Sequence, residues 1–189
     1  MSEDPSRCGL GDRLSNARQG GFFSWFCLAA VAADEPSPVR AFDPAYEWER
    51  FRPSGPRFHD LVELAFGLDA SGCIGAASLA IDRSFIEKPA VRPFARDIAK
   101  SFLYWVLPTD AQAALQDEIG LIGAFADGES VVIGHPDALW SHLLNRFTRA
   151  RSEAEVFMGR RSKSARSVGH TGIAFENCGG WLLIRVSRE

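Results

Sequence analysis

The chain has 189 residues, of which 46% are hydrophobic and 24% are charged, and its formal net charge is −3 at pH 7. This length and composition are those of one ordinary folded domain, and they leave no room for a second one. Because the net charge is slightly negative, it favours neither nucleic acid nor an anionic membrane as a partner.

The N-terminal region has the features of a secretory signal peptide. Arg13 and Arg18 precede an uncharged apolar run, Phe22–Val31, which leads into the small residues Ala30-Val31-Ala32. Export signals carry a basic segment, a short apolar helix and a small-residue cleavage site in this order. We therefore predict a cleavable signal peptide over 1–32 and a periplasmic or secreted bacterial protein.

The apolar run is too short for a transmembrane anchor, which needs about 18 apolar residues. The alternative is that the same residues form a core helix of a cytosolic interaction protein, since periodicity alone does not distinguish the two.

The remaining chain divides into an arm and one domain. Five prolines between positions 36 and 56 predict an extended arm over 33–57, because proline resists helix interiors and lacks a backbone donor. Aromatic residues within the arm indicate that it packs on the domain. Residues 58–189 are predicted to form that single domain.

Alternating apolar residues predict a first β-hairpin from His59–Leu68 and Ile74–Asp82. A helix is expected from Pro93 to the residue before Pro108, and a second, shorter helix from Thr109 to about Gly120.

Asp127-Gly128 is a turn pair that favours a second hairpin, over 121–134. A helix from Pro136 to Gly159 then precedes a third hairpin, His170–Glu176 with Trp181–Ser187. Three hairpins separated by helices predict an α+β fold, an antiparallel sheet with helices packed on one face.

Cysteine usage predicts one disulfide bond. Removal of residues 1–32 leaves Cys73 and Cys178 as the remaining pair, and a pair in an oxidising compartment favours a disulfide. Both lie in glycine-rich turns, where hairpin ends can be tied together. In a cytosolic protein both would be free thiols.

The clearest charge feature is the segment 146–166, which carries seven basic residues and two acidic ones. Arginine forks bind carboxylate and phosphate groups through paired hydrogen bonds. The segment therefore predicts a contact surface for an anionic envelope polymer, a lipid headgroup or an acidic protein, made by Arg146, Arg149, Arg160, Arg161, Lys163 and Arg166. The alternative is a solvated helix end followed by an unstructured loop.

The stretch Gly169-His170-Thr171-Gly172 places a histidine at the start of a strand, which loosely resembles papain-like and cell-wall thiol hydrolases. In such enzymes the histidine activates a cysteine at a helix N-terminus, so the resemblance implies Cys73 as the nucleophile. No polar third member follows His170 clearly in the sequence.

Other catalytic and metal-binding patterns are missing from the sequence. His135 and His142 have no further ligands at metal-site spacing, and no P-loop, Gly-x-Ser-x-Gly or Cys-x-x-Cys motif occurs. The sequence thus favours a non-catalytic binding or regulatory protein without a cofactor or metal. A thiol hydrolase that uses Cys73 and His170 is the alternative.

Overall fold

The computed structural model describes residues 10, 13–39, 42–109, 111–115 and 149–188. Its strands are β1 (Leu28–Ala30), β2 (Glu47–Pro53), β3 (Val62–Leu68), β4 (Ile74–Asp82), β5 (Lys163–Val168), β6 (Thr171–Cys178) and β7 (Trp181–Arg188). Its helices are α1 (Leu14–Ala17), α2 (Gly21–Phe26), α3 (Arg83–Glu87) and α4 (Arg92–Val106), and residues 111–115 and 149–157 are also helical.

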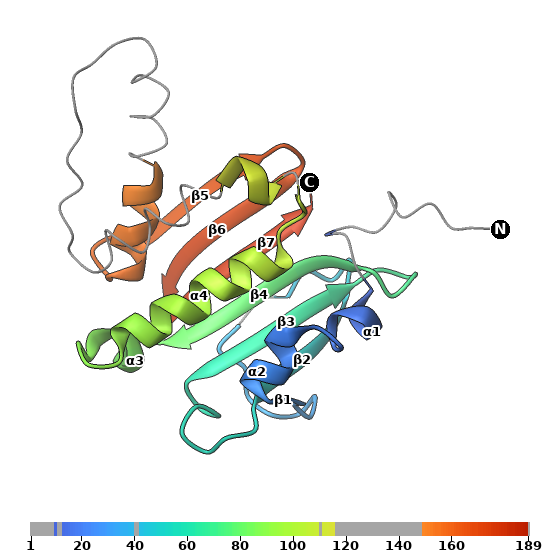
Figure 1. The fold of residues 1–189 in the computed structure, drawn as a ribbon, viewed down its shortest axis with the longest axis horizontal. Coiled ribbons are helices and arrows are strands. Elements are labelled where there is room, and N and C mark those ends of the chain that lie inside the picture. The colour runs from blue at the N-terminus through green and yellow to red at the C-terminus, as the bar shows by residue number, and fades with distance from the viewer. Residues whose placement is uncertain (1–9, 11–12, 40–41, 110, 116–148, 189) are drawn as a thin grey trace, which may run out of the picture.

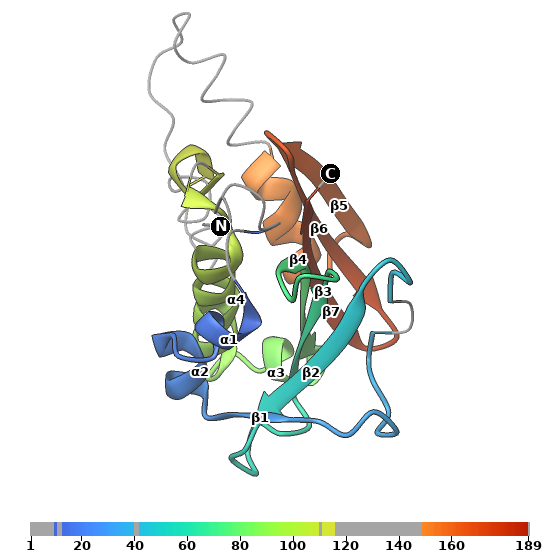
Figure 2. The same ribbon diagram turned by 90° about the vertical axis from the view of Figure 1, so that its right-hand side faces the viewer.

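The described strands form one antiparallel sheet in the order β1-β2-β3-β4-β7-β6-β5 (Figure 1). Two meanders, β2-β3-β4 and β5-β6-β7, join where β4 pairs with β7. Figure 2 shows α1, α2 and α4 on one side of this sheet and the chain between β1 and β2 on the other. The fold is therefore α+β, as the sequence predicts.

Individual elements agree with the sequence where apolar residues alternate cleanly. The first and third predicted hairpins correspond to β3–β4 and β6–β7, whereas the second, over 121–134, lies outside the described residues. The predicted helix at Pro93 corresponds to α4. The helix over 149–157 ends just before Gly159, which has a φ of 76° and suits a left-handed helix end.

The main hydrophobic core lies between the sheet and the helices. Val62, Leu64 and Phe66 of β3 point into it at alternate positions, and Ile98 and Phe102 of α4 meet them from the helical side. All five side chains are fully buried. Burial of apolar area on this face is the main stabilising contribution to the fold.

Helix α2 belongs to this core. Phe22, Phe23 and Phe26 are each 7% exposed, and Phe22 stacks on Trp105 of α4 with ring centroids 5.1 Å apart. Phe23 packs edge-on against Phe51 of β2, at 5.2 Å. After α2 the chain continues into β1, which pairs with β2. This packing favours the alternative of an N-terminal core helix, while cleavage after residue 32 stays a prediction.

Strand β2 departs from the extended arm that the sequence predicts over 33–57. It lies inside the sheet, between β1 and β3. Its apolar Phe51 faces the core, whereas Arg50 and Arg52 point to the opposite face. A strand with arginines on one buried face has no alternating apolar pattern, and the prolines around it favour an arm.

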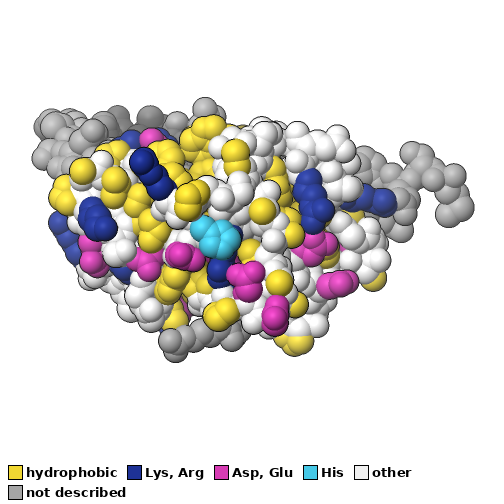
Figure 3. Space-filling model, turned by 90° about the horizontal axis from the view of Figure 1, so that it is seen from below, with side chains coloured by type: hydrophobic (Ala, Val, Ile, Leu, Met, Phe, Trp, Pro, Cys, Tyr) yellow, Lys and Arg dark blue, Asp and Glu magenta, His cyan; other side chains and the backbone are white. Residues whose placement is uncertain are grey.

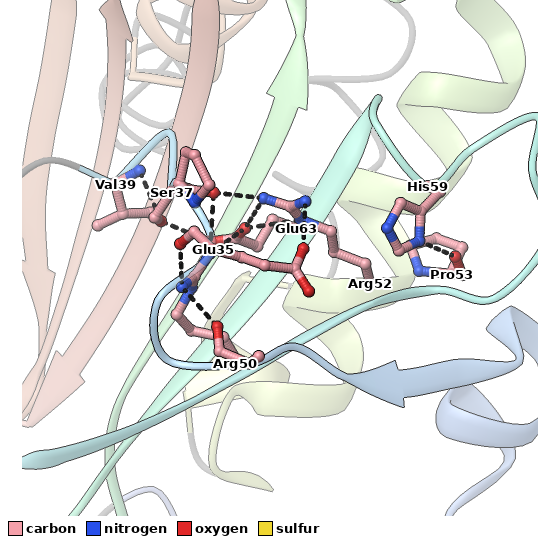
Figure 4. A network of polar contacts seen from close by, with 10 residues as sticks. Glu35, Ser37, Val39, Arg50, Arg52, Pro53, His59 and Glu63 are labelled. Atoms are coloured by element: carbon pink, nitrogen blue, oxygen red, sulfur yellow. Dashed lines mark hydrogen bonds and ion pairs between the residues drawn. The ribbon is translucent and has the colours of Figure 1, made fainter.

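A buried ion cluster holds the chain between β1 and β2 against this second face of the sheet. Glu63 of β3 is 1% exposed and accepts hydrogen bonds from Arg50 Nη2 at 3.0 Å, from Arg52 Nε at 2.9 Å and from the Ser37 hydroxyl. Both arginines also donate to the Pro36 carbonyl (Figure 4). The cluster therefore connects β2, β3 and the chain between β1 and β2.

Burial of Glu63 on its own would raise the pKa of its carboxyl group. Hydrogen bonds from Arg50, Ser37 and Arg52 act in the opposite direction and outweigh burial, so that the pKa of Glu63 lies below its ordinary value of 4.5. The carboxylate is consequently ionised at neutral pH, and it is the negative partner of the buried Arg50 and the half-buried Arg52.

Gly67 of β3 makes room for the side chains of Tyr46 and Trp48 at the start of β2. A Cβ atom at this position would lie 2.9 Å from Tyr46 Cβ and 3.0 Å from a ring carbon of Trp48. We expect Gly67→Ala to lower the free energy of unfolding by about 1–3 kcal/mol, as overpacking does. Urea unfolding measures the change. Gly55→Ala is the control, because a Cβ at Gly55 meets nothing within 4 Å, and an equal loss in both variants would contradict the close approach.

Candidate functional site

A polar recess of about 380 Å³ lies beside α3, where the turn between β6 and β7 meets the loop before β5. Three segments form it, and the backbone N–H of Arg83 ties two of them together by donating to the Gly180 carbonyl at 2.8 Å. We call this site the basic recess. It is lined by Arg83, Glu87, Gly159, Arg160, Arg161, Ser162, Asn177, Cys178, Gly179, Gly180 and Trp181.

Arg83 supplies a fixed positive charge in the basic recess. Its side chain is 14% exposed, donates from Nη1 to the Phe157 carbonyl, and lies 3.7 Å from the Glu87 carboxylate. Burial lowers the pKa of Arg83 below its ordinary value in spite of the neighbouring Glu87 carboxylate, but a guanidinium stays protonated in proteins. Gly159 makes room for it, because a Cβ there would clash with the guanidinium.

Asn177 positions the loop that carries the other two arginines. Its Nδ2 donates to the carbonyls of Val156 and Arg161, both at 2.7 Å, and its backbone N–H donates to the Ser162 carbonyl. The loop over 159–162 is thereby attached to the end of β6.

Arg160 and Arg161 differ in how much of their guanidinium groups is engaged. Arg161 donates from Nε to the Lys163 carbonyl at 2.9 Å and from Nη1 to the Ser152 hydroxyl at 3.0 Å. Arg160 is exposed, and its guanidinium makes no hydrogen bond or ion pair within the described residues. With Arg83, the recess holds three guanidinium groups and the single carboxylate of Glu87. This balance of charge suits an anionic group.

The structure separates the six basic residues that the sequence groups together. Arg160 and Arg161 line the basic recess, Arg149 and Lys163 are exposed outside it, and Arg146 lies outside the described residues. Arg166 instead faces the core, where it lies 2.7 Å from the carboxylate of Glu153, itself 1% exposed. Arg166 is therefore engaged in a buried ion pair and is not a surface contact.

This difference follows from a strand that the sequence analysis missed. Lys163–Val168 forms β5, and its side chains alternate between exposed and half-buried positions. The alternation turns Arg166 inward and Lys163 outward. The period of two is visible in the sequence, but its inner positions are a serine, an arginine and a valine, which do not form an apolar pattern.

The predicted bond between Cys73 and Cys178 is not formed. Cys178 is a free thiol, and Cys73 is disulfide-bonded but not to it. Cys73 lies directly before the first residue of β4. Cys178 lies near the other end of that strand, because it pairs with Trp181, and Trp181 pairs with Asp82, the last residue of β4. A strand of that length separates the two by roughly 30 Å, while a disulfide needs Cα atoms within about 7 Å.

Cys73 and His170 are likewise not brought together. Cys73 is 3% exposed and disulfide-bonded, so it is not available as a thiolate. His170 lies in the exposed turn before β6. Because β7 lies between β4 and β6, about two strand spacings, or roughly 10 Å, separate the two residues. A nucleophile and its base need hydrogen-bond contact.

On the lower face of the molecule, charges of both signs are mixed with apolar side chains (Figure 3). Within the described ranges, no cluster of three or more His, Cys, Asp or Glu side chains could hold a metal ion. In the same part of the chain, no helix has the length and apolar character needed to cross a bilayer.

Two residues of the basic recess, Arg83 and Asn177, were not expected from sequence. Arg83 lies far along the chain from Arg160, and neither residue gives a local signal, so that the fold alone brings them to the recess. Comparison of the chain with protein-family models, curated proteins and solved structures gives no match.

Proposed function

We propose that this is a non-catalytic binding protein whose basic recess holds the anionic group of a ligand or acidic partner. The observation that carries the proposal is the convergence of Arg83, Arg160 and Arg161 on one recess with a single opposing carboxylate. Charge-assisted hydrogen bonds from guanidinium to carboxylate or phosphate are about twice as strong as neutral ones.

The state of each arginine supports a role in binding. Arg83 is already oriented by the Phe157 carbonyl, so little side-chain entropy is lost when it meets an anion. Arg160 is exposed and can swing toward a bound group. The volume of about 380 Å³ suits a phosphate, a sugar acid or one acidic residue with its neighbours.

The compartment is a separate proposal. The basic segment, apolar run and small residues within 1–32 support export, whereas the burial of Phe22, Phe23 and Phe26 supports retention of these residues in the folded protein. An intact mass of the protein recovered from the cytosol and from the envelope fraction distinguishes the two. A mass that lacks residues 1–32 supports cleavage, and a full-length mass in both fractions contradicts it.

Two free cysteines among the described residues provide an internal test of the basic recess. Cys178 lines the recess, whereas Cys27 is an exposed thiol elsewhere on the molecule. We expect pyrophosphate at ten times its dissociation constant to slow alkylation of Cys178 about tenfold. Alkylation of Cys27 should stay unchanged, and peptide mapping by mass spectrometry follows both sites in one sample.

Variants identify the groups responsible for protection of Cys178. Arg160→Gln should remove most of the protection, while Arg57→Gln should keep it, because Arg57 is an exposed arginine outside the recess. Sodium chloride at the same ionic strength controls for screening. Equal slowing at Cys27 and Cys178, or none at either, would contradict the proposed anion site.

A further inference from the structure

Strand β5 is the last strand of the sheet among the described residues, so that one of its edges has no neighbouring strand within that part of the chain. The backbone N–H of Asn177 donates to the Ser162 carbonyl at 2.7 Å, which fixes the alternation of hydrogen-bonded pairs along β5 and β6. In an antiparallel pair every second residue turns its N–H and C=O away from the neighbour. By this alternation Lys163 and Ala165 present their backbone groups to the open edge, and both residues are exposed.

The open edge begins at the basic recess. Ser162, directly before β5, lines the recess, and so does Arg161. Arg161 Nε already donates to the Lys163 carbonyl at 2.9 Å, which agrees with the outward direction of that carbonyl. A chain segment paired along β5 would therefore reach the recess as it passes the Lys163 end.

The positive charge along this edge favours an acidic partner strand. Lys163 on β5 and Arg160 and Arg161 at its start are all exposed, and Lys163–Val168 contains no acidic residue. Lysine on an edge strand discourages pairing with neutral or basic strands. An acidic segment gains both the backbone hydrogen bonds of strand addition and favourable charge.

We infer that the partner is an acidic peptide segment that pairs with β5 as an added strand and places a carboxylate in the basic recess. This inference rests on the proposed function and names the class of partner. Backbone pairing supplies affinity, and the arginines select the acidic end.

A synthetic peptide of alternating threonine and valine with glutamates at one end is the probe. We expect fluorescence anisotropy to show binding to the full-length protein that is about tenfold weaker when alternate peptide amides are N-methylated, since several hydrogen bonds are lost. Replacement of the glutamates by lysines should abolish binding. The acidic peptide should also protect Cys178 from alkylation.

Ala165→Pro tests the edge from the side of the protein. Proline removes an outward N–H and is tolerated on edge strands, so the ladder between β5 and β6 should remain. We expect Ala165→Pro to weaken peptide binding about tenfold and Ala165→Thr, which keeps the N–H, to bind as wild type. Thermal unfolding checks that Ala165→Pro is folded, and the N-methylated peptide tests the same contacts if it is not.

The outcomes separate this inference from the proposed function. Strand addition would be overturned if the affinity for the peptide changed neither on N-methylation nor in Ala165→Pro. If pyrophosphate still protected Cys178 in that case, the anion site would remain supported. Peptide binding that ignores Arg160→Gln would overturn the contact with the recess. Protection by neither pyrophosphate nor peptide would overturn both proposals.

Discussion

A chain that begins at residue 33 is expected not to form the stable domain described here. It lacks α1, α2 and β1, and with them three phenylalanines that are each 7% exposed. Burial of one such side chain contributes about 1.5–3 kcal/mol, so the three together approach the whole stability of a typical domain, about 5–15 kcal/mol. Far-UV circular dichroism and urea unfolding of residues 33–189 and of the full chain measure the difference.

Point variants of α2 provide the matched comparison. Phe23→Ala should cost about 3–5 kcal/mol, as for other buried phenylalanines. Trp25→Ala should cost much less, because Trp25 is 54% exposed on the same helix. A fragment 33–189 that folds cooperatively with the stability of the full chain would contradict this expectation. Such a stable fragment is what the signal-peptide hypothesis requires, because cleavage after residue 32 leaves only this part of the chain.

Replacing Glu63 by glutamine is expected to lower the free energy of unfolding by about 3–5 kcal/mol, the cost of breaking a buried ion pair on one side. Arg50 would lose its negative partner while remaining buried, and Arg52 would keep only its ion pair with Glu35. Glu49→Gln is the control, because its ion pair with Arg18 is exposed on both sides and contributes about 0–1 kcal/mol. A loss below that of the control would contradict the role of the cluster.

The same residue predicts a dependence of stability on pH. Hydrogen bonds from Arg50, Ser37 and Arg52 lower the pKa of Glu63 below 4.5 in the folded state against the opposing effect of burial. A depressed pKa contributes stability that is present above the pKa of the unfolded chain and is lost as the pH falls through the folded value. Chemical unfolding below pH 4.5 should therefore show a shallower pH dependence for Glu63→Gln than for the wild type.

The elements that could be predicted from sequence are those whose buried faces are apolar. Strands β3, β4, β6 and β7 show alternating hydrophobic residues, and Pro93 and Pro108 bracket α4. These signals are local, so they need no knowledge of partners.

Strands β2 and β5 were missed for a shared physical reason. Each turns arginine toward a buried glutamate, Arg50 and Arg52 to Glu63 and Arg166 to Glu153. A charged residue in a sequence indicates a surface position, because its partner lies elsewhere in the chain. The apolar run at Phe22 cannot be assigned from sequence for a different reason. An export signal and a short core helix have the same composition, so the run fits both.

The candidate site was predictable only in part. Arg160 and Arg161 belong to a run of positive charge that the sequence displays, but the run does not show that Arg166 faces inward. Arg83 and Asn177 become part of the basic recess through the pairing of β4 with β7 and of β6 with β7. No spacing rule relates them.

Calorimetric titration of the full-length protein with pyrophosphate tests the basic recess most directly. We predict saturable binding of one anion per chain, weakened by added salt and reduced about tenfold in Arg160→Gln, with Arg57→Gln unchanged. Absence of saturable binding at low ionic strength, or an equal loss in Arg160→Gln and Arg57→Gln, would contradict an anion-binding site at this recess.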